Sequence, residues 1–341
     1  MKSFLKNKWP FVLIIVLFLL LSSSDYTMYL SILASINAIA VLGVVIITGY
    51  ARQLHLGQAA FMGLGAYVSA ILTIKLNWSW WFTIPAAVGV SIIFGVLLGI
   101  PSMKLRGGPY LALVTQVFGE IIYLIILNWI AVTGGPFGIN GIKRPELFGF
   151  AFKGLQPFFF LCIAFLLISY LICRQITISR YGRFFISIKE SEAAAQSLGI
   201  NTMKYKIIAF AIAAAFGGLA GTLYGPFIGF ISPDQFRWQA SLIIISMAIV
   251  GGLSKLEGGL IGSFALVFLP EFLRLTDQMR LIIYGALIII VLAFLPNGII
   301  SLWGKSPKQI QLMFKERFNE LVGSEKYIKK REGLPDKDLV K

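Results

Sequence analysis

Long runs of apolar residues, separated by short polar segments, dominate the chain. Most runs approach the ~20 residues that a helix needs to cross the ~30 Å hydrocarbon core of a bilayer. They are continuous rather than alternating, which excludes a transmembrane β-barrel. The pattern predicts an all-α polytopic membrane protein with about ten transmembrane helices, some of them short or broken. The runs fall at about 9–21, 28–49, 57–74, 81–100, 109–132, 156–173, 207–230, 240–253, 258–273 and 281–300.

The composition agrees with a membrane protein and with no soluble class. Of the 341 residues, 57% are hydrophobic and 13% are charged, whereas a soluble domain holds roughly one quarter charged residues. Cys162 and Cys173 lie in one apolar run. We therefore expect them to be small buried hydrophobic residues rather than redox or metal groups.

The net charge of +15 suggests a nucleic-acid partner, but the distribution of the charge argues against one. Basic residues flank the apolar runs. If the N-terminus is cytoplasmic and each run crosses the membrane, most of these residues lie in the segments on the inner side. We therefore expect a multi-pass protein of the plasma or inner cell membrane with both termini in the cytoplasm.

The predicted organisation has three parts. Residues 1–27 hold a cytoplasmic segment and the first span, which follows Lys2, Lys6 and Lys8 as a signal peptide would. No A-x-A cleavage site follows it, so we expect it to be retained. Residues 28–303 form the transmembrane domain. Residues 304–341 form a charged cytoplasmic tail that is suited to contact anionic membrane lipid.

Several runs are short or rich in glycine. Ala240–Leu253 and Gly258–Leu273 are either two short crossings or one re-entrant pair, and Gly57–Tyr67 has a similar character. Short, glycine-broken segments point to a transport pathway. Small residues that recur every four positions also let helices pack closely. Two roles are therefore open for the glycines that recur at this spacing: close helix packing or room for a transport pathway. They are Gly217, Gly221, Gly225 and Gly229.

Residues for catalysis are scarce. His55 is the one histidine, it has no second metal ligand beside it, and we expect it to be an interfacial polar residue. Gly304-Lys305-Ser306 resembles the end of a phosphate-binding loop, but Ile299 stands where that loop requires glycine. The chain is therefore expected to be no enzyme and to hold no cofactor, so that any ATP is bound by a partner.

Glu120 is the clearest acid within an apolar run. An ionisable group in hydrocarbon is costly unless it faces the bundle interior and finds partners. Two roles are open for this side chain. It is either a pathway or ion-binding group, or a structural group bonded to Thr115, Gln116 or Asn128.

The longest polar segment, 174–206, contains a short helix-forming stretch, Ser191–Leu198. Ser191 is a suitable N-cap, Glu192 suits the positive helix start, and Gly199 suits the C-terminal cap. Such a helix between two spans is either a connector or a surface that fits a groove on a partner protein.

Four segments in this order resemble the permease subunits of the branched-chain amino acid ABC importers over roughly residues 28–300. They are the glycine-rich segment Gly57–Tyr67, the stretches Arg106–Ala112 and Thr133–Ile139, and the loop Gly182–Ile200, followed by the run from Gly217 through Gly251-Gly252 to Pro270-Glu271. The importer loop places Glu before an Ala pair that corresponds to Ala194 and Ala195. Here Glu192 stands one residue early.

The resemblance implies the fold of a type II ABC importer permease. It also implies a homologous second permease subunit, two cytoplasmic ATPase subunits and an extracytoplasmic solute-binding protein that delivers leucine, isoleucine or valine. The implied ATPase-coupling residues are Glu192, Ala193, Ala194, Ala195 and Gly199. The implied translocation pathway holds Gly57, Gln58, Gly63, Tyr67, Tyr110, Thr115, Glu120, Thr133 and Gly134.

Three other functions compete with this interpretation. A sister ABC permease for urea, amides or another small polar solute would share the same motifs. An autonomous secondary transporter would use Glu120 as its ion-coupled group, but it has no need of a docking helix. An intramembrane enzyme is disfavoured because no nucleophile–base pair or metal cluster is evident in the sequence.

Overall fold

The computed structural model describes residues 24–102, 108–147, 150–152, 154–272, 277–295, 298–302 and 309. The predicted first span at 9–21, the basic residues Lys104 and Arg106, and the predicted tail 304–341 (apart from Gln309) therefore lie outside the described residues.

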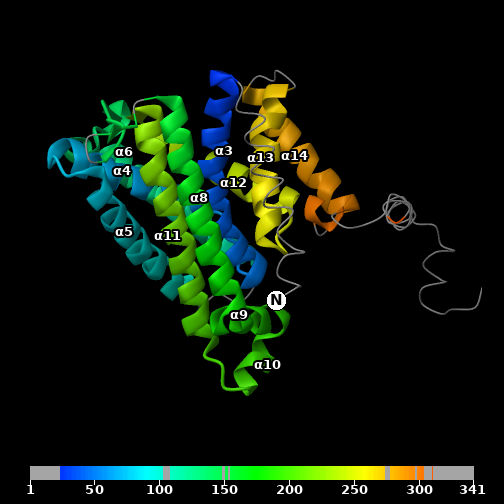
Figure 1. Cartoon of the computed structure of the whole chain (residues 1–341). Helices are drawn as coiled ribbons and strands as arrows, with labels where there is room; N and C mark the ends of the chain where they lie inside the picture. The colour runs from blue at the N-terminus through cyan, green and yellow to red at the C-terminus, as the bar shows by residue number, and fades with distance from the viewer. Residues whose placement is uncertain are drawn as a thin grey trace, which may run out of the picture.

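Helices form almost all of the regular structure in this part of the chain (Figure 1). The elements in order are α3 (Asp25–Val44), the π-helical turn η1 (Val45–Tyr50), α4 (Gln58–Lys75), α5 (Trp80–Ser102), α6 (Gly108–Asn128), α7 (Ile130–Thr133), η2 (Gly135–Phe137), β1 (Ile139–Asn140), β2 (Glu146–Leu147), β3 (Phe150–Ala151), α8 (Leu155–Ile178), α9 (Arg180–Glu190), α10 (Glu192–Ser197), α11 (Thr202–Ile228), β4 (Phe230–Ile231), η3 (Pro233–Phe236), α12 (Trp238–Gly251), α13 (Leu256–Phe272), α14 (Asp277–Phe294) and η4 (Ile299–Leu302).

Six helices among the described residues are long and apolar enough to cross a membrane. They match the runs predicted from 28–49 to 207–230, so the all-α membrane class is confirmed. The total of about ten crossings stays a prediction, because α12 has 14 residues and would extend only about 21 Å. The six spans are Asp25–Tyr50, Gln58–Lys75, Trp80–Ser102, Pro109–Asn128, Leu155–Ile178 and Thr202–Ile228.

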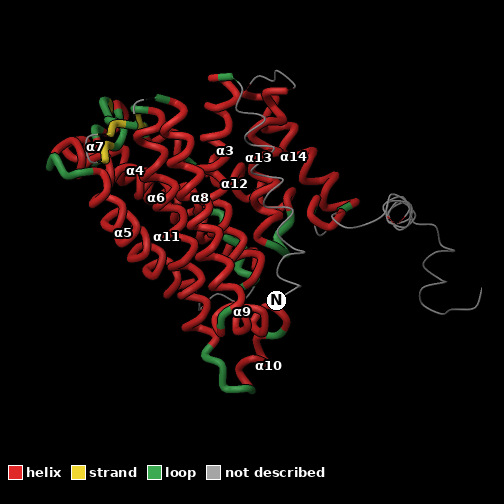
Figure 2. The backbone as a smooth tube through the Cα atoms, viewed as in Figure 1, coloured by secondary structure: helices red, strands yellow, loops and turns green. Residues whose placement is uncertain are grey.

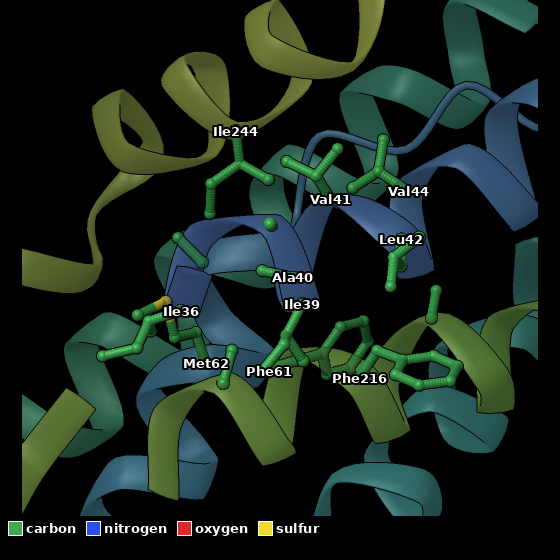
Figure 3. Packing of buried hydrophobic residues seen from close by; sticks show 14 of the residues in the cluster. Ile36, Ile39, Ala40, Val41, Leu42, Val44, Phe61, Met62, Phe216 and Ile244 are labelled. Atoms are coloured by element: carbon green, nitrogen blue, oxygen red, sulfur yellow. The ribbon is translucent and has the colours of Figure 1, made fainter. Parts of the chain in front are cut away.

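The bundle is built around the span formed by α3 and η1. In its most apolar window 89% of the residues are buried, against 28% for α6. Figure 3 shows side chains of α3 such as Ile39 and Leu42 packed against Phe61 of α4 and Phe216 of α11. Helices that are apolar on every side belong inside a bundle or against lipid. The span 25–50 is therefore the core of the bundle, and the exposed apolar faces of α5, α6 and α8 suit lipid.

Segments that the sequence places on the same side of the membrane meet in the structure. At one end, which we call the inner end, Arg52 Nη1 donates to Lys189 O at 3.1 Å, and α9 and α10 project there (Figure 1). At the outer end Lys75 Nζ donates to Ala131 O at 2.7 Å. The outer end also carries α7 and the short strands (Figure 2). These contacts agree with the alternation of crossings expected from the charges.

The short strands are two antiparallel pairs that close the outer loops. Strand β1 pairs with β4, with Ile139 opposite Ile231 and Asn140 opposite Phe230. Strand β2 pairs with β3 in the same sense. The β1–β4 pair joins the loop after α6 to the end of α11, so the outer loops on two sides of the bundle are held together.

The two short predicted runs form the helical hairpin α12–α13. A Cβ atom at Gly251 would overlap the Gly258 carbonyl oxygen, so the two backbones touch. The turn of the hairpin lies against Gly49, since a Cβ there would overlap Leu253 O. Gly49 is three residues from Arg52, which contacts the inner end. This position favours two short crossings over a re-entrant pair that turns back halfway.

Candidate functional site

The projecting segment α9–α10 corresponds to the predicted coupling loop. Its helix α10 begins and ends where the sequence predicts. The Ser191 side chain caps it by accepting a hydrogen bond from Ala194 N at 3.3 Å. At the other end Gly199 has φ +78°, Gly199 N donates to Gln196 O and Ile200 N donates to Ala195 O. These two bonds form a Schellman motif, which fixes the direction in which the chain leaves the helix.

Some side chains of α10 contact the rest of the chain, and the others are exposed. Ala193, Ala194 and Gly199 are exposed, whereas Ala195 is buried against the chain. Glu192 Oε1 lies 2.6 Å from Lys206 Nζ, in an ion pair with the start of α11. The exposed part of α10 therefore combines the small side chains of Ala193 and Ala194 with the polar Gln196 and Ser197, and the Glu192 carboxylate is paired within the chain. Leu198, which the sequence reasoning did not select, is 79% exposed beside this surface.

An unwound segment, residues 51–57, separates η1 from α4 and brings three predicted pathway residues together. Leu56 N donates to Thr115 Oγ1 at 2.9 Å, which ties the segment to α6. A Cβ at Gly57 would lie 2.5 Å from Thr115 O, so only glycine permits this approach. Gln58 is fully buried, and its Nε2 donates to Ala40 O and Ala213 O, both at 3.0 Å. Gln58 thereby joins α3 to α11.

His55 of the unwound segment was expected at the interface, and that expectation is wrong. The side chain is fully buried between Phe61 and Phe210, with ring centroids 5.5 and 5.7 Å away. Burial lowers the pKa of His55 to about 3, so the ring is neutral. Among the described residues neither ring nitrogen has a hydrogen-bond partner of good geometry, although the Gln58 side chain lies close enough to act on the ring.

Two further pathway residues lie on α4 under the outer turn η3. A Cβ at Gly63 would contact Phe236 at 3.0 Å. The ring of Tyr67 meets the same Phe236 edge to face, with centroids 6.2 Å apart. Phe236 also packs against Tyr224 of α11. The turn η3 therefore closes the outer end of the bundle over Gly63 and Tyr67.

The remaining predicted residues lie apart from these groups. Thr133 is buried, and its hydroxyl lies 2.6 Å from Ile126 O, which closes the turn after α6. Gly134 follows with φ +78°. Tyr110, at the inner end of α6, is 64% exposed. Glu120 lies halfway along α6, and its Oε1 atom is buried. The structure thus separates the predicted pathway residues into an inner group, an outer group and Glu120 between them.

A cavity of about 380 Å³ opens between α3, α12 and α13. Its lining is mainly aliphatic, and its polar side chains come from Asn37, Gln235, Gln239 and Glu271. A volume of this size is within the range of small-molecule pockets. Sequence reasoning missed it, because its lining residues come from six separate elements, α3, α4, α11, η3, α12 and α13. Among the described residues, no group of three or more His, Cys, Asp or Glu side chains forms a metal site.

Comparison with known proteins gives a consistent result. Residues 26–292 match the family described as branched-chain amino acid transport system, permease component. The chain is 31% identical over 317 residues to the high-affinity branched-chain amino acid transport system permease protein LivM of Escherichia coli (strain K12), covering 86% of this chain and 72% of that protein. It is 25% identical to the corresponding permease protein LivH of Salmonella typhimurium, covering 79% and 92%. No solved structure gives a significant match.

Proposed function

The chain belongs to the family of permease components of branched-chain amino acid ABC transport systems, and from this premise we propose how it works. It is a multi-pass membrane subunit without an ATPase site of its own. We propose that it moves leucine, isoleucine or valine inward by alternating access, while partner subunits bind and hydrolyse ATP. The names of the LivM and LivH relatives support this choice of solute.

The observation that carries the proposal is the exposed surface of α10. Helix α10 projects beyond the inner end of the bundle (Figure 1). The helix is capped, and its small side chains would let it fit into a groove on another protein. An autonomous carrier has no use for such a projection. We propose that Ala193, Ala194 and Gly199, with Leu198 beside them, form the contact with an ATPase subunit. Glu192 and Ala195 would then hold α10 in place.

The contacts of α10 suggest how ATP-driven movement reaches the pathway. The Glu192–Lys206 ion pair joins α10 to α11. The Arg52–Lys189 hydrogen bond joins α9 to the unwound segment. Both connections lead to Gln58, which bonds to α3 and α11. We propose that displacement of α10 shifts α11 against α3 and opens or closes the pathway at Gly57, Gln58 and Thr115. Gly63, Tyr67, Tyr110, Glu120, Thr133 and Gly134 complete the proposed pathway.

The proposed topology follows from the two ends of the bundle. We propose that the inner end faces the cytoplasm, with 1–27 as a cytoplasmic segment and the first span, 28–303 as the transmembrane domain with its coupling loop at 174–206, and 304–341 as a cytoplasmic tail. A Cβ at Gly298 would lie 2.7 Å from Gly251 C, so the segment after α14 returns to the hairpin turn at the inner end. That position supports a cytoplasmic C-terminus and the type II importer arrangement.

We propose that the complete importer holds this chain, a homologous second permease, two ATPase subunits and an extracytoplasmic solute-binding protein. The test is purification of the tagged chain in mild detergent, with mass spectrometry of the proteins that accompany it. Stoichiometric amounts of an ATPase and a second permease are expected. A chain that purifies alone and still moves solute without ATP would contradict the proposal.

A cysteine cross-link sharpens the same test. Ala194→Cys places a thiol on α10, and the natural Cys162 and Cys173 are buried, so they give little background. A thiol-reactive cross-linker should join the Ala194→Cys chain to the ATPase subunit. The matched control is Trp78→Cys, an exposed position at the outer end, which should give no such product. Equal cross-linking at both positions would refute α10 as the docking helix.

A further inference from the structure

Charged and aromatic side chains meet between α6 and the start of α12, near the outer end of the bundle. We call Glu120, Tyr123, Asp234 and Arg237 the outer polar cluster. Tyr123 lies at its centre. The Tyr123 hydroxyl donates to Asp234 Oδ1 at 3.1 Å, and Arg237 Cζ stands over the Tyr123 ring, 4.9 Å from its centroid. Glu120 precedes Tyr123 by three residues on α6, so the two side chains are neighbours on one face of the helix.

One atom on each of two oppositely charged, partly buried side chains of the cluster lacks a hydrogen-bond partner. Glu120 Oε1 and Arg237 Nε are both buried, and within the described part of the chain neither atom has a hydrogen-bond partner. Asp234 differs, because its carboxylate already accepts from Tyr123. A buried polar atom without a hydrogen-bond partner is costly, and more so within a membrane. An external group that both accepts from Arg237 and donates to Glu120 would remove that cost.

The position of Glu120 on α6 leaves the cluster accessible. Gln116, Glu120 and Tyr123 are spaced i, i+4 and i+7, so they follow one face of the helix, and all three are partly buried. The neighbouring apolar residues Val117, Ile121 and Leu124 are the exposed ones. A polar stripe thus borders the apolar surface of α6 and leads to Arg237. This arrangement suits a solute that moves along the protein, since lipid would not solvate it.

We infer that the outer polar cluster binds the head group of an α-amino acid, with Arg237 holding the carboxylate and Glu120 the ammonium group. A planar guanidinium matches a carboxylate with two parallel hydrogen bonds. The ring of Tyr123 holds the guanidinium plane by a cation–π contact. A zwitterion adds no net charge, so it fills both vacant positions without disturbing Asp234.

This inference rests on the proposed function and adds the residues that recognise the substrate. It also separates substrate classes. Urea and amides carry no charges and would offer Glu120 and Arg237 only neutral hydrogen bonds, whereas every α-amino acid brings a countercharge to both. Leucine, isoleucine and valine share this head group, so the cluster explains the acceptance of all three. It does not distinguish among their side chains.

The test is leucine uptake by the complete importer in proteoliposomes, measured together with ATP hydrolysis and subunit content. Glu120→Gln and Arg237→Gln should each lower uptake about 10-fold or more, the effect of losing one charge-assisted hydrogen bond. ATP hydrolysis stimulated by the binding protein should persist, because α10 is untouched. Arg237→Lys keeps a cation over Tyr123 and should retain intermediate uptake.

Matched controls come from the same end of the molecule. Arg144 is also an outer arginine in a cation–π contact, with its Cζ 5.6 Å from the Phe158 centroid. Arg144→Gln and Glu146→Gln remove the same charges outside the cluster and should leave uptake unchanged.

Three results would overturn the inference. Normal uptake in Glu120→Gln and Arg237→Gln would show that the cluster does not touch the substrate. Loss of the second permease from these variants would show that the two charges pair across a subunit interface. A wild-type complex that takes up no leucine would refute the proposed function itself, whereas the first two results leave it standing.

Discussion

Gly221 and Gly225 of α11 are one helical turn apart, and the structure predicts different effects of adding a methyl group to each. A Cβ at 221 would overlap Met62 O and would lie 2.7 Å from Ala66 N and 2.9 Å from Met62 C, all backbone atoms of α4. A Cβ at 225 would meet Ile142 Cδ1 at 3.6 Å, an ordinary contact. Gly221→Ala therefore forces α4 and α11 apart, and Gly225→Ala does not.

The size of the effect follows from these distances. Carbon atoms pack at about 3.5–4.0 Å, so Gly221→Ala requires a separation of roughly 1 Å along this contact. Overpacking of this kind costs about 1–3 kcal/mol, and the backbone cannot rotate away as a side chain could. Gly225→Ala should be close to neutral, because the gain from alanine as the better helix former is offset by crowding of its Cβ against the ring of Pro226.

The assay is thermal unfolding of the purified chain or complex in detergent, followed by the fraction that remains monodisperse. We expect a lower midpoint for Gly221→Ala and a nearly unchanged one for Gly225→Ala. Equal midpoints for the two variants would refute the assignment of Gly221 to a backbone contact. They would also leave undecided whether the glycines of α11 serve helix packing or a transport pathway.

Three other predictions concern the inner end. Gly199→Val should abolish ATP-driven uptake while the chain still reaches the membrane. Its Cβ would touch nothing, but φ +78° strains a side chain there and so disturbs the end of α10. Normal uptake would remove the loop from the mechanism. Leu198→Glu should reduce the co-purified ATPase about 10-fold and leave stability within about 0.5 kcal/mol, since this side chain is exposed; undiminished ATPase would exclude Leu198 from the interface. The folded chain holds His55 neutral with a pKa of about 3, whereas the unfolded chain protonates it below about pH 6.5. The free energy of unfolding should therefore fall by about 2 kcal/mol between pH 7.5 and pH 5, and His55→Gln, measured by the same thermal assay, should lack that part of the decrease; an identical pH dependence would contradict the burial of His55.

The sequence predicted the spans well because an apolar run of helix length has few alternatives in a bilayer. All six long helices of the described residues lie within a few residues of the predicted runs. How deeply the segments between the spans are buried in the bundle was not predictable in this way. The polar residues of 51–57 suggested an inner loop, yet His55 is fully buried, because Phe61 of α4 and Phe210 of α11 pack against its ring.

The residues of the candidate site also differ in how far the sequence predicts them. Helix α10 was predictable because its caps, Ser191 and Gly199, are local signals within a few residues of each other. Arg237 was not, because its contact with Tyr123 joins positions more than one hundred residues apart. From the sequence alone it counted as one of several outer basic residues. Its contact with Tyr123 in the folded chain is the basis of the role that we propose for it.

The central claim is that ATP bound by partner subunits, and not an ion gradient acting on this chain, drives leucine inward. The most direct test is uptake of labelled leucine by right-side-out membrane vesicles that contain the complete importer and its binding protein. The account predicts uptake that requires ATP inside the vesicle, persists when ionophores collapse the ion gradients, and disappears when this chain is deleted. Uptake without ATP that stops when the gradients collapse would contradict it, and would identify the chain as a secondary transporter.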